Sequence, residues 1–170
     1  MKVSTRAHYG LRAMTELAAA YEQGLMPLSE IARSEQLPLA YLEQLIAELR
    51  RAGLVEGIRG VHGGYRLARH PDKITIGDIY RVLEGPIAPV DCTTVDYLPG
   101  TCAVEDSCLS RSVWERVRDS IESVLDSTSL QDLRHEHAAA VAARVIPRVI
   151  PIETLRGAGD EDCVTERAHQ

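Results

Sequence analysis

The 170-residue chain has no phenylalanine and only one tryptophan, although 45% of its residues are hydrophobic. A core must therefore be built from Leu, Ile, Val and Ala, which suits helices. The absence of any run of about 18 uninterrupted apolar residues disfavours a membrane span. No apolar stretch follows the single lysine near the start, so we expect no secretory signal and a cytoplasmic protein.

The net charge of −6 excludes a simple polycation, but the charge is unevenly distributed. Residues 1–80 carry a net charge of +1, and residues 81–170 carry −7. A nucleic-acid-binding surface therefore requires that the basic residues of the first half gather in space. The sequence contains no nucleophile–base pair and no phosphate-cradling glycine loop before a helix, so we do not expect an enzyme.

Three helices are predicted in the first third of the chain. Residues 5–22 repeat apolar side chains at spacings of three and four. Ser29 is expected to cap a second, brief helix. Pro38 precedes a third helix over residues 39–51, which Gly53 ends. Two short helices joined by a tight turn predict a helix-turn-helix motif.

A β-hairpin is expected directly after the third helix. Residues 54–58 and 65–67 have the composition of short strands, and residues 59–64 between them form a glycine-rich turn. Because the hairpin follows a recognition helix and has basic residues near its tip, it is predicted to be a wing. Thr75 is expected to cap another helix over residues 76–83.

Residues 86–108 show no regular pattern and contain Cys92, Cys102 and Cys108. Irregular segments of this length are usually functional. The spacing lacks the paired cysteines of structural zinc sites and of redox motifs. Three thiolates on one loop can hold one side of an iron–sulfur cluster and leave a position for a fourth ligand. The alternatives are three unligated thiols or a zinc-stabilised protein. Cys163, in the acidic tail, is interpreted as incidental.

Residues 109–126 predict a long helix with a narrow apolar stripe, which is typical of a helix that packs against a partner helix. Ser129 is expected to cap a last helix over residues 130–144. The predicted fold is mainly α with a small β-hairpin. Its expected parts are a winged helix-turn-helix domain (1–85), a cysteine-bearing loop (86–108), dimerisation helices (109–145) and an extended, disordered tail (146–170).

The DNA-contacting residues are expected at the start of the third helix and on the wing. Gln can bridge adenine and Glu can accept a hydrogen bond from cytosine, while Arg59 suits a phosphate or the minor groove. The alternatives are a solvated helix face and an ordinary glycine-rich hairpin. The candidates are Ala40, Tyr41, Glu43, Gln44, Arg50, Arg59, Gly60 and His62.

Several segments together resemble the winged-helix family that includes the iron–sulfur regulator IscR, the nitric-oxide sensor NsrR and the cysteine-metabolism repressor CymR. The resemblance covers about residues 1–135, and the wing and the three-cysteine loop are its most specific parts. It is carried by residues 42–45, 49–55, 59–65, 79–86, 114–119 and 125–130.

The resemblance implies a homodimer that binds a palindromic operator and acts mainly as a repressor. CymR-like members lack the loop cysteines and work through a partner enzyme, whereas IscR-like members have three cysteines and bind a cluster. This sequence falls on the IscR-like side, which implies control by iron–sulfur status or by redox or nitrosative stress. Resemblance to IscR favours a 2Fe–2S cluster, although three cysteines also suit a 4Fe–4S cluster.

Two features depart from the family pattern. The nine residues between Cys92 and Cys102 are more than the best-known members have, and Arg111 stands where IscR has a histidine ligand. NsrR-like relatives take a ligand from the first helix at the position that matches His8. His8 is therefore the candidate fourth ligand, reaching across the dimer, and the alternative is a histidine on the helix surface. Weaker candidates are Glu105 and Asp106.

Overall fold

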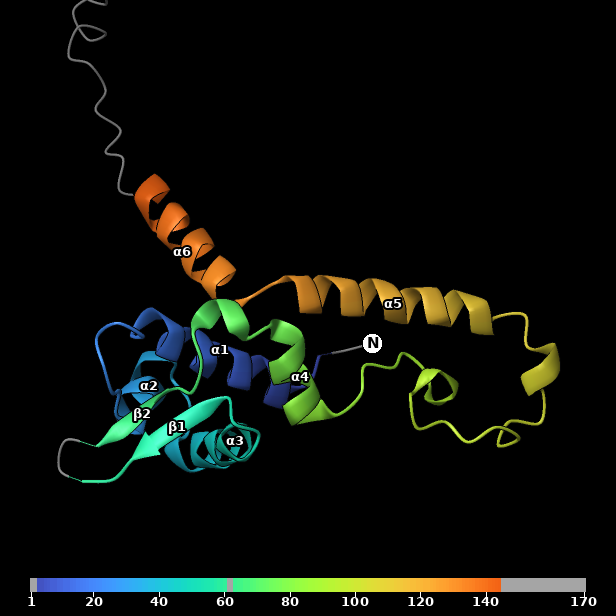
Figure 1. Ribbon diagram of the computed structural model, residues 1–170, viewed down its shortest axis with the longest axis horizontal. Helices are drawn as coiled ribbons and strands as arrows, with labels where there is room; N and C mark the ends of the chain where they lie inside the picture. The colour runs from blue at the N-terminus through green and yellow to red at the C-terminus, as the bar shows by residue number, and fades with distance from the viewer. Residues whose placement is uncertain (1–2, 61–62, 145–170) are drawn as a thin grey trace, which may run out of the picture.

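The computed structural model describes residues 3–60 and 63–144. This part of the chain forms helices and one two-stranded antiparallel sheet, which confirms the predicted winged helix-turn-helix class (Figure 1). The elements are α1 Thr5–Ala19, α2 Leu28–Ser34, α3 Leu39–Arg51, β1 Val55–Ile58, β2 Gly64–Leu67, α4 Ile76–Glu84, α5 Arg111–Ser127 and α6 Leu130–Arg144.

The predicted helix ends are correct at α3 and wrong at α1 and α2. Gly53 follows α3 with a φ of 72°, a backbone conformation that favours glycine. α1 ends at Ala19 and not at residue 22, because residues 20–23 form a turn in which the Gln23 N–H donates to the Ala20 carbonyl at 2.8 Å. Ser29 does not cap α2: the helix begins one residue before it, after Pro27, and has no side-chain cap.

The expected caps of α4 and α6 are present. The Asp78 N–H donates to Thr75 Oγ1 at 3.0 Å, and the Thr75 N–H donates back to the Asp78 carboxylate at 3.2 Å. Ser129 and Asp132 make the same reciprocal pair at the start of α6, at 3.2 and 2.8 Å. A capping residue of this kind typically stabilises a helix by about 1 kcal/mol.

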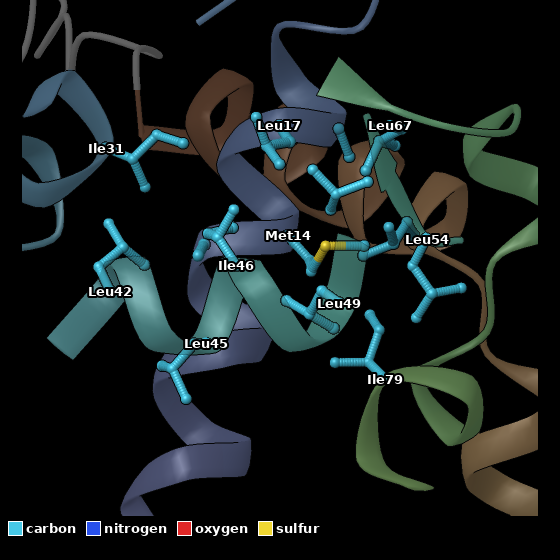
Figure 2. Packing of buried hydrophobic residues seen from close by; sticks show 14 of the residues in the cluster. Met14, Leu17, Ile31, Leu42, Leu45, Ile46, Leu49, Leu54, Leu67 and Ile79 are labelled. Atoms are coloured by element: carbon cyan, nitrogen blue, oxygen red, sulfur yellow. The ribbon is translucent and has the colours of Figure 1, made fainter. Parts of the chain in front are cut away.

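The hydrophobic core lies where α1 packs against α3, α4 and the hairpin (Figure 2). Met14 and Leu17 of α1 are fully buried there. The stripe of α3 repeats at the helical period and turns one side of the helix inward. Its members are Leu42, Leu45, Ile46 and Leu49, each at most 1% exposed. The opposite side of α3 is thereby left on the surface.

The wing is joined to the segment that enters α2. Met26 and Tyr65 exchange two backbone hydrogen bonds of 2.9 Å each. Gly64 is needed at this junction, because a Cβ there would lie 2.8 Å from the Met26 carbonyl oxygen. The hairpin is thus fixed relative to the helix-turn-helix.

α5 extends away from this domain at its N-terminal end (Figure 1). Near its C-terminal end it is tied to α4, where the Arg81 guanidinium donates to both Asp126 carboxylate oxygens at 2.6 and 2.7 Å. α5 buries none of its residues within the single chain. Residues 86–108 lead outward from α4 to the N-terminal end of α5 (Figure 1), and this segment is called the cysteine loop below.

Candidate nucleic-acid interface and cysteine loop

The outer face of α3 presents most of the predicted base-reading residues. Ala40, Glu43 and Gln44 are exposed within its first two turns, and Arg50 is exposed in its last turn. The buried stripe on the other side fixes which residues face outward. This exposure leaves the N-terminal side chains of α3 accessible, as the base-reading side chains of a recognition helix must be.

Tyr41 is less exposed than the other predicted base-reading residues of α3. It is half-buried, packs against the core, and its ring meets the Tyr9 ring edge-on at 6.1 Å between centroids. Part of its surface therefore serves to position α3 against α1.

The two arginines of the wing differ in their contacts. Arg59 is exposed at the end of β1, beside Gly60, whose φ is 129°. Arg66 on β2 is instead paired with the Glu56 carboxylate, at 3.0 Å from Nε and 2.9 Å from Nη2. Arg59 is therefore the wing cation better placed to meet a phosphate. His62, predicted at the tip, lies outside the described residues.

The three thiols of the cysteine loop are free and accessible to different degrees. Cys92 is half-buried in a short 3-10 turn, Asp91–Thr93. Cys102 is exposed, and Cys108 is half-buried just after a second 3-10 turn, Glu105–Ser107. The loop is thus partly ordered by local turns that its sequence pattern did not predict.

Glu105 is the centre of a hydrogen-bond network in the loop. Its carboxylate accepts from the Gly100 N–H at 2.6 Å, from Arg111 Nη1 at 3.0 Å and from the Tyr97 hydroxyl at 3.2 Å. These donors, led by the Gly100 N–H, hold the pKa of Glu105 below its ordinary value. Tyr97 also accepts a hydrogen bond from the Cys102 N–H at 3.2 Å. Glu105 therefore stabilises the loop around Cys102.

Arg111 and Cys108 lie at the junction of the loop with α5. Arg111 pairs with Glu105 and with Glu115, each at 3.0 Å, and its guanidinium lies 5.5 Å from the Tyr97 ring centroid. The Ser110 hydroxyl lies 3.5 Å from Cys108 Sγ. Hydrogen bonding from Ser110, with a smaller effect of Arg111, lowers the pKa of the Cys108 thiol. A lower pKa favours the thiolate, which is the form that binds metals and reacts.

His8 is exposed on α1 and lines an apolar cavity of about 320 Å³ between α1, α4 and α5. The α5 residues in that cavity are Ile121 and Leu125. Arg111, at the other end of α5, is ten residues before Ile121, a distance of about 15 Å along a helix. His8 therefore lies at the opposite end of α5 from the Cys108 of its own chain.

The apolar stripe predicted on α5 is largely exposed. Val113, Trp114, Val117 and Val124 have between 36% and 63% of their surface open to solvent. Such exposure is unusual for side chains repeating at helical spacing and is typical of a helix that packs against another chain.

Residues 3–136 match the model of the Rrf2 family, described as an iron-dependent transcriptional regulator. The chain belongs to the Rrf2 family. It is 47% identical over 133 residues to the HTH-type transcriptional regulator CymR of Bacillus subtilis (strain 168), covering 78% of this chain and 89% of that protein. It is 36% identical over 133 residues to IscR of Aliivibrio salmonicida (strain LFI1238), covering 78% of this chain and 77% of that protein.

Solved structures of a CymR and an IscR protein share the fold. T. potens IscR has a TM-score of 0.66 at 46% identity, covering 82% of this chain and 90% of that one. CymR, the global cysteine regulator of B. subtilis, has a TM-score of 0.65 at 47% identity, covering 78% of this chain and 95% of that one. The chain is thus a helix-turn-helix transcriptional regulator, and the relatives' names support the expectation that it is not an enzyme. No helix within residues 3–60 and 63–144 has the length and apolarity needed to cross a bilayer.

The thiols of this Rrf2 chain suit an iron–sulfur cluster in their chemistry, because Cys thiolates are the usual cluster ligands. Within the described ranges, however, no three His, Cys, Asp or Glu side chains lie together as a metal site. The donor type therefore fits, whereas the described part of the chain does not assemble three such donors.

The structure adds residues to the site that sequence reasoning missed. Tyr97 and Arg111 order the loop, and Arg118 of α5 donates to the Thr93 carbonyl at 3.0 Å, next to Cys92. The sequence pattern presents Glu105 only as a weak ligand candidate. A seven-residue spacing places Arg111 and Arg118 on one side of the predicted helix, but it does not indicate their partners.

Proposed function

We propose that this Rrf2 regulator binds a palindromic operator as a homodimer, mainly as a repressor, and that an iron–sulfur cluster on Cys92, Cys102 and Cys108 controls its affinity. The observation that carries the proposal is the position of three free thiols on a loop anchored to α5. α5 in turn is tied to α4 of the DNA-binding domain. When bound, the cluster would supply an iron- and redox-dependent link between the three cysteines.

Homodimerisation is supported by α5. Its apolar stripe is exposed, and a cavity lies beside Ile121 and Leu125. Two crossed copies of α5 would cover this surface and set the separation of the two recognition helices. A palindromic operator requires a fixed separation of about 34–36 Å or a multiple of it, so a small shift of α5 can change affinity strongly.

His8 is proposed as the fourth ligand in trans. Within one chain it lies at the far end of α5 from Cys108, but an antiparallel crossing of two copies would bring opposite ends of the two α5 helices together. Glu105 is a weaker candidate, because its carboxylate already accepts three hydrogen bonds. We favour a 2Fe–2S cluster by resemblance to IscR.

The cluster is tested by anaerobic purification followed by iron, sulfide and zinc analysis and visible absorbance. We expect a brown protein, and loss of colour in Cys92→Ala, Cys102→Ala and Cys108→Ala. His8→Ala should weaken the cluster, whereas the control His135→Ala, which changes an exposed histidine of α6, should not. Colourless, iron-free wild type prepared without oxygen refutes the cluster and leaves DNA binding intact.

DNA binding is tested with Arg59→Ala on an operator selected from random DNA by the wild-type protein. Loss of one phosphate contact should weaken binding and reduce the slope of log affinity against log salt by about one. Arg116→Ala makes the same charge change on α5, away from the wing, and serves as the control. Equal slopes for wild type and Arg59→Ala would refute the wing contact.

A second candidate is a CymR-like repressor that acts through a partner enzyme and uses its thiols as direct sensors. The 47% identity to CymR and the lowered pKa of Cys108 favour it. It predicts a colourless protein whose operator binding changes on thiol oxidation and which co-purifies with a metabolic enzyme. Retention of colour and iron in the purified protein would argue against it.

A further inference from the structure

Two arginines on one face of α5 contact the cysteine loop at two places, one next to Cys92 and the other near Cys108. Arg111 and Arg118 are seven residues apart, which places them two turns apart on the same side of the helix. Arg111 reaches the Glu105 carboxylate and Arg118 reaches the Thr93 carbonyl, both at 3.0 Å. The two arginine side chains are only 32% and 27% exposed, so both contacts are partly shielded from water.

Each contact restrains a cysteine through its neighbours. Thr93 directly follows Cys92, is 2% exposed, and its hydroxyl donates to the Val90 carbonyl at 2.8 Å. This 3-10 turn packs on α5. At the other end, Cys108 is three residues from both Glu105 and Arg111, which are ion-paired to each other.

The two anchor points on α5 are separated by about 10 Å, the rise of seven helical residues. Thiolates that share one metal ion lie within about 5 Å of each other, since metal–sulfur bonds are about 2.3 Å long. The two anchor points on α5 are therefore about twice as far apart as two thiolates that share one metal ion.

We propose that Arg111 and Arg118 form a latch that keeps Cys92 and Cys108 apart, and that joining the two thiols requires release of at least one arginine. The inference rests on the proposed role of the cysteine loop as the sensor. It makes both arginines positioning residues, which set the starting geometry of the thiols without contacting a ligand. It also assigns a function to the arginine that replaces the histidine of IscR-like relatives.

The latch is tested on full-length protein without any cluster, using phenylarsine oxide. This trivalent arsenical joins two thiols through one arsenic atom and releases one water molecule, with no change of oxidation state. Cys102→Ser and Cys163→Ser in the background leave Cys92 and Cys108 as the only pair. The bridging rate is followed by the mass of the adduct, and circular dichroism verifies that each variant is folded.

Arg118→Ala should accelerate bridging by about tenfold, the factor that corresponds to one hydrogen bond from a charged group. Arg118→Lys keeps a donor and should restore a slow rate. Arg116→Ala, an exposed arginine of the same helix, should react like the parent. Alkylation of each single thiol by iodoacetamide should be unchanged in Arg118→Ala, because the latch controls separation and not exposure.

Equal bridging rates in Arg118→Ala and Arg116→Ala would overturn the latch. An equal rise in alkylation of Cys92 would also overturn it, since greater exposure alone would then explain faster bridging. These results are independent of the colour of anaerobic protein. A colourless wild type refutes the cluster and leaves the latch, whereas a brown protein with equal bridging rates refutes only the latch.

Discussion

Gly10 lies where α4 packs on α1, and a methyl group at this position would meet Leu83. A Cβ built on Gly10 would stand 2.1 Å from Leu83 Cδ1, whereas Leu83 Cγ would be at 3.5 Å. Both residues are buried. The steric clash of Gly10→Ala is therefore with one δ carbon of a buried leucine.

The expected effect of Gly10→Ala is the difference of two opposing contributions. In an unobstructed helix, Ala is more stabilising than Gly by about 1 kcal/mol. Overpacking a core costs about 1–3 kcal/mol. We expect Gly10→Ala to lower the free energy of unfolding by about 1 kcal/mol. In a Leu83→Val background, which lacks the δ carbons, the same change should instead raise it by about 0.5–1 kcal/mol.

The assay is urea unfolding of the four proteins of this cycle, followed by circular dichroism. One protein concentration must be used throughout, because the apparent stability of an associating protein depends on concentration. The informative quantity is the coupling between the two sites, expected near 2 kcal/mol. Additive effects, or a stabilising Gly10→Ala in the wild-type background, would refute the close α1–α4 contact.

Three further predictions concern other parts of the fold. Thr75→Ala removes the α4 cap and should lower the free energy of unfolding by about 1 kcal/mol in the same urea assay, with Thr75→Ser as a nearly neutral control. Gln36 has a φ of 53°, so Gln36→Gly should raise the melting temperature by about 2 °C in calorimetry; a lower melting temperature would contradict this. The hydrogen bonds from Arg81 hold the pKa of Asp126 below its ordinary 3.8, so the pair stabilises the fold above that pH and loses its effect as the pH falls through the folded-state pKa. The stability advantage over Asp126→Asn, about 0.5 kcal/mol for this half-exposed pair, should therefore shrink on acidification, and a constant difference from pH 5 to pH 2 would contradict it.

The helices were predictable where local residues decide their ends. Pro38 and Gly53 enclose α3, and Thr75 caps α4 through contacts within four residues, so the sequence alone located both. The prediction from Ser29 was wrong because the helix already begins at Leu28, directly after Pro27. At α1 the apolar Tyr21 continues the helical spacing, but it packs against the core from a turn.

The candidate site was predictable only in part, because its contacts join distant segments. The cysteines and the recognition face follow from residue type and spacing. The partners of Arg111 and Arg118 depend on how a 23-residue loop folds back along α5, which no local pattern encodes. Tyr41 shows the same limit: its spacing allows an outward position, while its contact with Tyr9 turns it partly inward.

The two backbone hydrogen bonds between Met26 and Tyr65 have a consequence for the footprint on DNA. They join the wing to the segment that enters α2, so in the proposed complex the wing contacts keep a constant distance from those of the helix-turn-helix. On the proposed palindromic operator, base changes within a half-site should then affect all states of the protein equally. Only the number of base pairs between half-sites can discriminate one state from another, so operators with altered spacers are the substrates on which regulation is best measured.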